Sequence, residues 1–399
     1  MLFMGVEKMQ FDDGDFLSTV EDVILPYWLH NGFDPVTGQF EERLSSSGGE
    51  IRSVPRRLMV QSRQIYVFSE AENARIISHS GDVAVNAMEN ILKIYCPDHD
   101  YRRGFAYSAD RDGIIVSGFR EAYTHAFVLF ALASIYRLTN DRRYINIAEQ
   151  VDSFITENLL DKLYGGLYTS ASKEMDHKLQ NPMMHLLEAY LSLAAAGGGE
   201  VYIRKSECII KFFEDTIYDS KKGGFPEIFS HDWAPHPKHD LANTYEPGHH
   251  FEWLWLLSRY DSMTGSHHSE LIEGLWGAGC KGLSPEGHCY DLIDFDGRIV
   301  RSSMRLWPHT EGVRAASLRI GYDASAMRTI ANLLSTIGGV FLRRPFAAGW
   351  IDHFDASRAP LVDYVPASSL YHIYGAYVEL RSQTRGKLMV TAALETGAK

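Results

Sequence analysis

The segment Tyr164-Gly165-Gly166-Leu167-Tyr168 is one of six short stretches in which turn residues and a glycine usually precede an aromatic or apolar residue. The six glycines lie 58 to 66 residues apart along the chain, at Gly38, Gly104, Gly166, Gly224, Gly287 and Gly349. Glycine readily adopts the positive φ of tight turns, so each stretch is predicted to be a loop or a short hairpin. A near-constant period of this length indicates a repeat architecture.

Two helical patterns fit into each interval between these glycines. The twelve predicted helices span residues 16–30, 57–71, 81–92, 120–138, 142–159, 182–196, 201–217, 247–260, 269–279, 308–320, 324–342 and 366–381. The helix that follows each glycine is the more apolar one; residues 126–134, for example, are almost entirely apolar. Other helices alternate charged and apolar residues at helical spacing, which is typical of helices that face solvent.

These patterns predict an all-α fold, an (α/α)6 barrel of six helix pairs with short hairpin or loop segments at one end. The apolar helices would form the inner ring, and residues 1–399 would make up one catalytic domain. The alternative is an open α-solenoid. We favour a closed ring because six pairs suffice to close and the first and last units lack polar capping character.

Composition excludes several classes of protein. The 399 residues carry 39 Lys and Arg against 51 Asp and Glu, a formal charge of −12 that argues against nucleic acid as a partner. Charged residues interrupt the N-terminus and no apolar run reaches the roughly 18 residues that a membrane span needs, so we expect a soluble cytoplasmic protein. The four cysteines show no CxxC pairing and are expected to be reduced thiols. The oligomeric state is not readable from the sequence.

Chemistry-bearing side chains recur near the start of the helix that follows each glycine. They are Arg63, Tyr123, His185, His249, Trp307 with Glu311, and His372. Proline favours the first helical position, and Pro182, Pro247 and Pro366 each precede one of the histidines, so all three histidines are predicted in the first two turns. The partial positive charge of a helix N-terminus disfavours imidazolium, so a neutral histidine there could act as a general base.

Helical spacing supplies neighbours for two of these histidines. Asn181 and His185 are four residues apart, and His249 and Glu252 are three apart, so each pair shares a helix face. A carboxylate in this position can orient an imidazole, and we expect Glu252 to orient His249. A single histidine is more often structural than catalytic, but three at equivalent repeat positions favour a functional site.

The sequence gives no support for a cofactor. There is no nucleophile elbow, phosphate loop or dinucleotide fingerprint. The histidine-rich segment 231–240 fits no common zinc spacing and is expected to be a loop that lines the pocket. We therefore expect neither a metal nor an organic cofactor.

Five motifs together resemble the N-acylglucosamine 2-epimerase superfamily, and the resemblance spans essentially the whole chain. They begin at Arg57 (RLMVQSRQIY), Asn181 (NPMMHLLE), Glu246 (EPGHHFEW), Arg305 (RLWPHTE) and Tyr371 (YHIY). The resemblance implies an (α/α)6 barrel that acts on a sugar. It also implies that His249 and His372 are the acid/base pair. Around the sugar it places His185, Arg63, Asn181, Tyr123, Glu252 and Trp307, and we add Glu311 to the residues expected to bind substrate.

The flanking sequence suggests which branch of the superfamily this chain is similar to. Residues 32–43, followed by Arg56-Arg57, look more like the mannose isomerases than the cellobiose 2-epimerases. Disaccharide-active members carry a tryptophan shortly before the last histidine, and residues 365–369 contain none, which favours a monosaccharide. We therefore predict a cofactor-independent isomerase that interconverts D-mannose and D-fructose through a cis-enediol.

Other functions remain open at this point. The nearest is a sugar 2-epimerase of the same superfamily, acting on N-acylglucosamine or on glucose and mannose. Glycoside hydrolysis would need a carboxylate pair such as Glu252 and Glu311. A barrel that only binds sugar or protein is a third class. A phosphorylated or sulfonated sugar is also possible, because Arg63 and the pair Arg56 and Arg57 could contact an anion.

Overall fold

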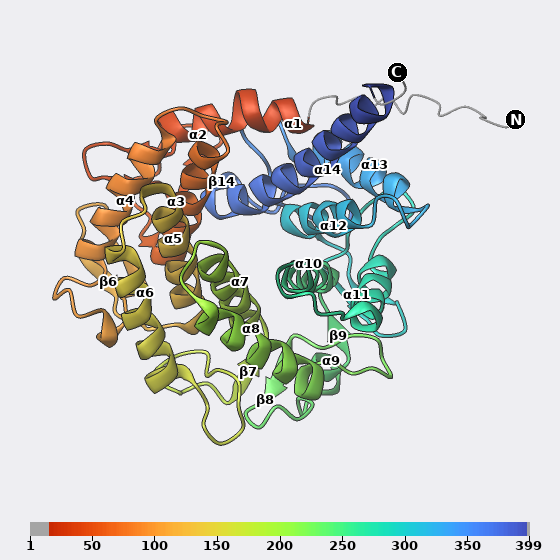
Figure 1. The fold of residues 1–399 in the computed structure, drawn as a ribbon, viewed down its shortest axis with the longest axis horizontal. Coiled ribbons are helices and arrows are strands. Elements are labelled where there is room, and N and C mark those ends of the chain that lie inside the picture. Colours follow the sequence, from red (N-terminus) through yellow and green to blue (C-terminus); the bar gives the residue numbers. More distant parts are fainter. Residues whose placement is uncertain (1–15, 397–399) are drawn as a thin grey trace, which may run out of the picture.

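Six helices form an inner ring in the computed structural model, which describes residues 16–396, with the backbone alone at residues 239 and 384–396. They are α3 (Leu58–Asn73), α5 (Ala122–Thr139), α7 (Asn181–Ala195), α10 (Pro247–Thr264), α12 (Leu306–Leu318) and α14 (Leu370–Thr396). Each is the helix that follows a repeat glycine, so the predicted inner helices are confirmed. The protein is an (α/α)6 barrel (Figure 1).

The outer ring consists of the helices that precede each repeat glycine. These are α1 (Phe16–Ser18) with α2 (Leu25–Asn31), α4 (Ser80–Ile94), α6 (Arg143–Phe154), α8 (Glu200–Phe212), α11 (Ser269–Lys281) and α13 (Ala326–Thr336). Several contain a π-helical turn: η1 (Thr19–Ile24), η3 (Ile155–Leu159), η4 (Phe213–Ile217) and η5 (Ile337–Phe341). Shorter helical elements are η2 (Tyr101–Arg103), α9 (His239–Ala242) and η6 (Ala367–Ser369). The ends of the predicted domain, residues 1–15 and 397–399, lie outside the described residues.

Contacts between the first and last units close the ring. In Figure 1 the chain runs once around the barrel and brings α1 beside α14, and η1, which follows α1, also contacts α14. Gln64 Nε2 on α3 donates a hydrogen bond of 2.7 Å to the carbonyl of Ala367. Tyr377 on α14 donates a hydrogen bond of 2.6 Å to Glu21. These contacts exclude the open solenoid.

Short strands connect neighbouring units around one end of the barrel. The pairs are β3 (Arg43–Ser45) with β14 (Tyr364–Pro366), β4 (Arg56–Arg57) with β5 (Ser108–Ala109), β7 (His177–Leu179) with β8 (Ile228–Ser230), β9 (Thr244–Tyr245) with β10 (Leu292–Asp294), and β12 (Met304–Arg305) with β13 (His353–Phe354). A bridge between Glu121 and Ser170 joins the second and third units. The hairpin of β1 (Phe33–Asp34) with β2 (Gln39–Phe40) lies at the predicted Gly38 segment. Two further hairpins inside a unit, β5 with β6 (Ile115–Ser117) and β10 with β11 (Ile299–Arg301), lie beyond the glycine segments and were not predicted.

A buried side chain four residues after the N-cap fastens four of the inner helices to the preceding glycine segment. His125, His250 and His309 accept the backbone N–H of Phe105, Phe225 and Cys289, at 2.9, 3.2 and 2.9 Å. The other ring nitrogen of each bonds the carbonyl of the helix N-cap residue. Gln61 plays this role in the first unit, with Phe40 as its partner. Burial lowers the pKa of all three histidines to about 4, so they are neutral and structural.

Two further predictions can be compared with the described residues. Pro366 does not begin a helix: it is the last residue of β14, pairs with Arg43, and precedes η6, so α14 begins at Leu370. All four cysteines are free. None of the helices within residues 16–396 combines the length and the apolarity that a membrane crossing requires.

We predict that His309→Ala lowers the free energy of unfolding by about 2–4 kcal/mol, because the buried N–H of Cys289 loses its acceptor and a cavity remains. Urea denaturation would measure the loss. The control is His267→Ala, at an exposed position, where a change within about 0.5 kcal/mol is expected. Equal stability of the two variants would contradict the structural role of His309.

Candidate active site

All nine residues predicted to form the site lie at the N-terminal ends of the inner helices, where the strands connect the units. Arg63 lies on α3, Tyr123 on α5, Asn181 and His185 on α7, His249 and Glu252 on α10, Trp307 and Glu311 on α12, and His372 on α14. Most of their side chains are buried or nearly so. The repeat places these ends around one axis, so residues up to 309 positions apart in sequence come together.

Arg63 is a buried cation held mainly by aromatic rings. Its guanidinium donates hydrogen bonds of 2.7 Å to the Tyr123 hydroxyl and 3.2 Å to the carbonyl of Ser368. The guanidinium carbon lies 4.3 Å from the ring centre of Phe127 and 4.8 Å from that of Tyr371. Within the described part of the chain no carboxylate forms an ion pair with Arg63, and its Nε has no hydrogen-bond partner. Arg63 is therefore available to a negative charge that develops on a substrate.

His372 is bonded to a carboxylate and is nevertheless neutral. Its Nδ1 donates a hydrogen bond of 2.8 Å to Glu311, and Glu311 also accepts one of 2.7 Å from Arg314. Burial, together with the positive charges of Arg63 and Arg314, holds the pKa of His372 well below its usual value. A buried neutral imidazole with one nitrogen fixed by a carboxylate is suited to act as a general base.

His249 has the opposite charge state. Its Nδ1 donates a hydrogen bond of 2.7 Å to Glu227, and a carboxylate oxygen of Glu246 lies 3.9 Å away. Burial lowers the pKa of His249, but the negative charges of Glu227 and Glu246 outweigh burial and raise it to about 9. His249 is thus protonated at neutral pH, because these carboxylates outweigh the field of the helix N-terminus.

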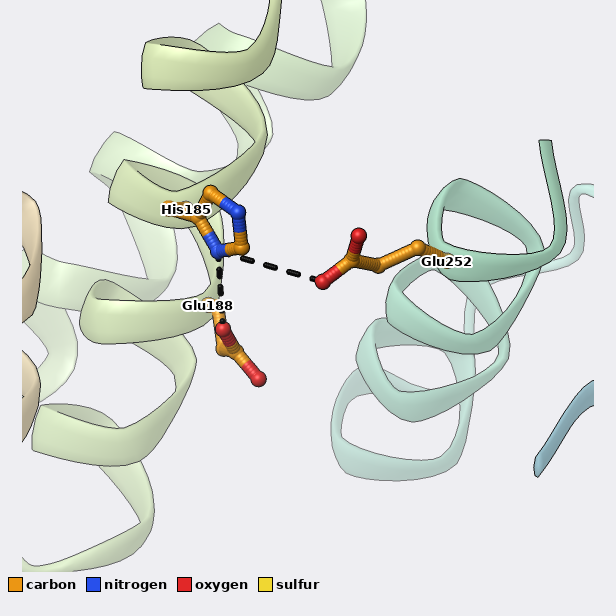
Figure 2. Close-up of side chains that lie close together, drawn as sticks. All are labelled: His185, Glu188 and Glu252. Carbon is orange, nitrogen blue, oxygen red and sulfur yellow. Dashed lines mark hydrogen bonds and ion pairs between the residues drawn. The ribbon is translucent and has the colours of Figure 1, made fainter. Parts of the chain in front are cut away.

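The expectation that Glu252 orients His249 is wrong. The nearer carboxylates are on Glu227 and Glu246, whereas Glu252 points toward His185, with 3.9 Å between its Oε1 and His185 Nδ1 (Figure 2). Helical spacing alone suggested the pairing of His249 with Glu252. The side chain of Glu252 turns to the next helix of the ring instead.

His185 forms the third pair of a histidine and a carboxylate. Its Nδ1 donates a hydrogen bond of 3.2 Å to Glu188, one turn further along α7 (Figure 2). Burial lowers the pKa of His185 to about 4. Burial and the neighbouring carboxylates Glu311 and Glu188 raise the pKa of Glu252 well above its usual value, which favours its protonated form. Its buried Oε1 has no hydrogen-bond partner among the described residues.

Trp307 and Asn181 complete the arrangement. The Trp307 ring contacts both His249 and His372, with 4.9 and 5.6 Å between ring centres. The buried Oδ1 of Asn181 has no partner among the described residues. Asn181 and Tyr123 both line a cavity of about 190 Å³. The unpartnered atoms of Asn181, Glu252 and Arg63 are polar groups that a hydroxylated ligand could bind.

Two clusters contain ligand atoms within 4.8 Å of one another, a spacing that a cation could bridge: His185, Glu188 and Glu252, and Glu252, Glu311 and His372. Arg314 already supplies positive charge there, because it is bonded to Glu311 and lies 3.8 Å from Glu188. Protonation of Glu252 removes a further negative charge. The expectation of no metal stays a prediction.

Three important residues were not among those predicted. Glu188 and Arg314 each lie three residues after a predicted site residue, so the spacing rule applied to His249 and Glu252 would have found them. Glu227 is different, since it lies 22 residues before His249. Its one sequence signal is its place three residues after the repeat glycine Gly224.

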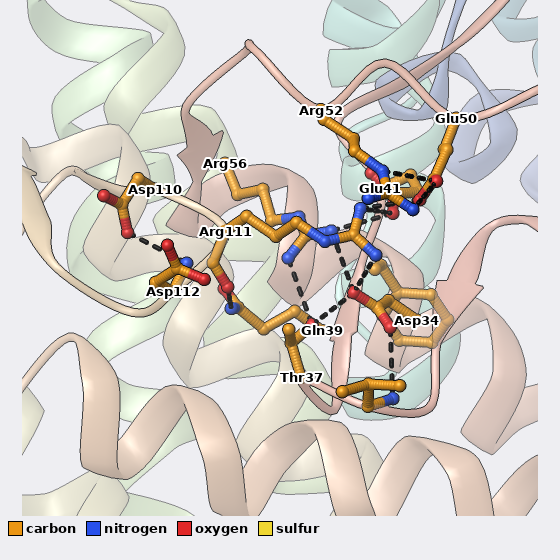
Figure 3. Close-up of polar contacts among 12 residues, drawn as sticks. Asp34, Thr37, Gln39, Glu41, Glu50, Arg52, Arg56, Asp110, Arg111 and Asp112 are labelled. Carbon is orange, nitrogen blue, oxygen red and sulfur yellow. Dashed lines mark hydrogen bonds and ion pairs between the residues drawn. The ribbon is translucent and has the colours of Figure 1, made fainter.

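Arg56 and Arg57 are not available to bind an anion. Arg56 lies 2.7 Å from Glu41 in a buried network that also contains Asp34 and Arg111 (Figure 3). Arg57 is bonded to Glu42, with distances of 2.6 to 2.9 Å. Both arginines therefore fasten β4 to residues 34–42 of the same unit.

Comparison with known proteins gives the family. The model of the N-acylglucosamine 2-epimerase (GlcNAc 2-epimerase) family matches residues 38–376. The chain belongs to this family. It is 30% identical to a mannose-6-phosphate isomerase of Rhizobium meliloti, over 94% of this chain and 98% of that protein. A D-mannose isomerase of Thermobifida fusca is 30% identical over 56% of this chain and 58% of its own.

A solved structure supports the barrel. The cellobiose 2-epimerase of Spirochaeta thermophila superposes with a TM-score of 0.81 at 21% identity, covering 94% of this chain and 99% of that one. This member of the GlcNAc 2-epimerase family therefore has the expected fold. Membership also shows that it is a sugar isomerase or 2-epimerase.

We predict that Glu311→Gln lowers kcat by about 10–100-fold, because the carboxylate that orients His372 is lost. Glu311→Ala should in addition destabilise the fold by about 3–5 kcal/mol, since buried Arg314 loses its closest carboxylate. The measurements are steady-state kinetics and urea denaturation. Glu273→Gln, which removes a more exposed carboxylate of α11 paired with Arg319 at the C-terminal end of α12, is the control and should leave kcat unchanged. A wild-type kcat for Glu311→Gln would contradict the role of Glu311.

Proposed function

We propose that this protein is a metal-independent aldose–ketose isomerase that interconverts D-mannose and D-fructose through a cis-enediol. The observation that carries this proposal is the pairing of a neutral histidine with a protonated one. The rings of His372 and His249 both contact the ring of Trp307. Burial and the charges around each histidine shift their pKa values in opposite directions. Proton transfer between adjacent carbons needs both a base and an acid of this kind.

The proposed steps assign one task to each histidine. His372 removes the proton from C2 of the open-chain aldose while His249 donates a proton to O1, which gives the enediol. While the enediol is bound, the proton on His372 exchanges with solvent. His372 then gives a proton to C1, and His249 recovers a proton from O2, which gives the ketose. Each histidine ends in its starting protonation state, so no oxidant, reductant or metal is needed. The same pair can exchange protons with the ring and anomeric oxygens to open the pyranose.

Arg63 would stabilise the charge that develops on the substrate oxygens. It is a buried cation with a free Nε and without a carboxylate partner in the described part of the chain. Buried donors of this kind are effective because the low local dielectric strengthens their interaction with an oxyanion. Asn181, Tyr123, His185 and protonated Glu252 would bind the remaining hydroxyl groups.

The charge balance favours an unphosphorylated sugar. A phosphate monoester carries close to two negative charges at neutral pH and needs more than one free cation. Arg56, Arg57 and Arg305 already pair with carboxylates, and Arg63 alone among the site's described arginines does not. Glu121 also lines the small cavity beside Tyr123 and Asn181. D-Mannose is therefore the proposed substrate, although a similar protein is named a mannose-6-phosphate isomerase.

A 2-epimerase is the alternative, because the same barrel is found in a cellobiose 2-epimerase. Return of the proton to C2 from the opposite face, in place of C1, would give the 2-epimer. Two isomerases among the similar proteins, each 30% identical, favour the isomerase.

The decisive experiment follows EDTA-treated protein with D-mannose in heavy water by proton NMR and chromatography. We predict fructose that carries deuterium at C1. Glucose with deuterium at C2 and no fructose would identify an epimerase, and absence of any exchange would exclude D-mannose as substrate. A parallel reaction with mannose 6-phosphate should be much slower, and a faster one would overturn the assignment of an unphosphorylated substrate.

We predict that His372→Asn and His249→Asn each lower kcat/KM by about 10²–10⁴-fold, the usual contribution of a general acid or base. Thermal unfolding should show that both variants remain folded. His177→Asn, at a partly exposed histidine on β7, should keep wild-type kinetics. Near-normal activity of either site variant would remove that histidine from the mechanism.

A further inference from the structure

Glu227 is fixed at the boundary between the third and fourth units. It directly precedes β8, which pairs with β7 in a register that sets Ile228 opposite Leu179. Gln180 follows Leu179, and its Nε2 donates a hydrogen bond of 3.0 Å to Glu227. The amide oxygen of Gln180 in turn accepts a hydrogen bond of 2.8 Å from the Trp253 indole. Two units and helix α10 therefore hold Glu227 in place.

The Glu227 carboxylate accepts three hydrogen bonds from three different groups. Besides Gln180, the donors are the backbone N–H of Glu246 at 3.0 Å and His249 Nδ1 at 2.7 Å. Burial raises the pKa of Glu227, but His249, Gln180 and the Glu246 N–H outweigh it and lower the pKa below its usual value. Glu227 is therefore an ionised acceptor, and the Nδ1–H of His249 is directed at it. The Nε2 of His249 is left for the substrate.

Several other charged groups face His249, and they do not replace Glu227. Glu246 lies 3.9 Å away but forms a salt bridge of 2.8 Å with Arg305. Glu252 is protonated and points toward His185, and His185 and His250 are both neutral. Glu227 alone among the described carboxylates both contacts the imidazole directly and has no arginine or lysine partner.

We propose that Glu227 is the positioning residue that fixes His249 with Nδ1 protonated and keeps it cationic, so that Nε2–H can donate a proton to a substrate oxygen. Glu227 does not touch substrate; it acts through His249. The inference rests on the proposed function for its meaning in catalysis. The protonation of His249 can nevertheless be measured without any substrate.

The first test is a titration of His249 by NMR in protein with ¹⁵N-labelled histidine, with the signal assigned from its loss in His249→Asn. In the wild type we expect His249 to lose its proton near pH 9. In Glu227→Gln, which keeps the size of the side chain but removes its charge, the midpoint should fall by about 1–3 pH units. A midpoint unchanged in this variant overturns the proposal, whether or not the protein isomerises mannose.

The second test is the pH dependence of kcat/KM. Activity requires protonated His249, so it should fall as the pH rises through about 9 in the wild type and at a correspondingly lower pH in Glu227→Gln. Glu89→Gln, which removes a carboxylate paired with Arg143 on the outer ring, is the control and should not move this limb. A purely structural role would instead lower the thermal stability of Glu227→Gln and leave the limb where it is, which would also overturn the proposal.

If Glu227→Gln does not fold, Gln180→Leu provides an independent variant. It removes the donor at 3.0 Å but keeps the charge of Glu227 and its contact with His249. His249 should then stay protonated to within about 1 pH unit of the wild-type midpoint. A larger fall would show that Gln180, and not the charge of Glu227, holds His249 cationic.

Discussion

The rest of this barrel depends on one hydrogen bond that recurs in several units. Its donor is a backbone N–H just after a repeat glycine. Its acceptor is a buried side chain four residues after the N-cap of the inner helix that follows. Three units use a neutral histidine and one uses glutamine. This bond fixes the start of the inner helix relative to the glycine segment and gives the buried backbone N–H of that segment an acceptor. The N-terminal turns of successive inner helices therefore lie at the same end of the barrel, and the site lies at this end.

At that end of the barrel a second kind of hydrogen bond, from a histidine Nδ1 to a carboxylate, occurs three times. The charge of the histidine differs among the three pairs. His372 and Glu311 lie beside Arg314 and Arg63, so positive charge and burial keep the imidazole neutral. His249 and Glu227 lie among acidic groups, and the imidazole is protonated. The partner of each carboxylate, more than the histidine itself, decides which imidazole is an acid and which is a base.

The bonding of the two ring nitrogens separates the structural histidines from the proposed functional ones. His249 and His250 are neighbours in the sequence, yet His250 is bonded to backbone on both sides, whereas His249 keeps one nitrogen free for substrate. Helical rotation of about 100° per residue turns the two side chains to different faces. The resemblance to the GlcNAc 2-epimerase family implied His249 as the site residue, and the repeat alone would have given no reason to prefer it over His250.

The sequence by itself determined the closed ring, the identity of the inner helices and the end at which the site residues gather, because a repeat period and apolar helix faces are local properties of the chain. The contact of Glu188 with His185 is also local, because residues three apart share a helix face, although Glu188 was not among the predicted site residues. The contact of Glu227 with His249, and hence the charge of His249, was decided only by the tertiary structure. That contact spans 22 residues and depends on the register of β7 with β8 and on the packing of α10 beside them, which no local pattern encodes.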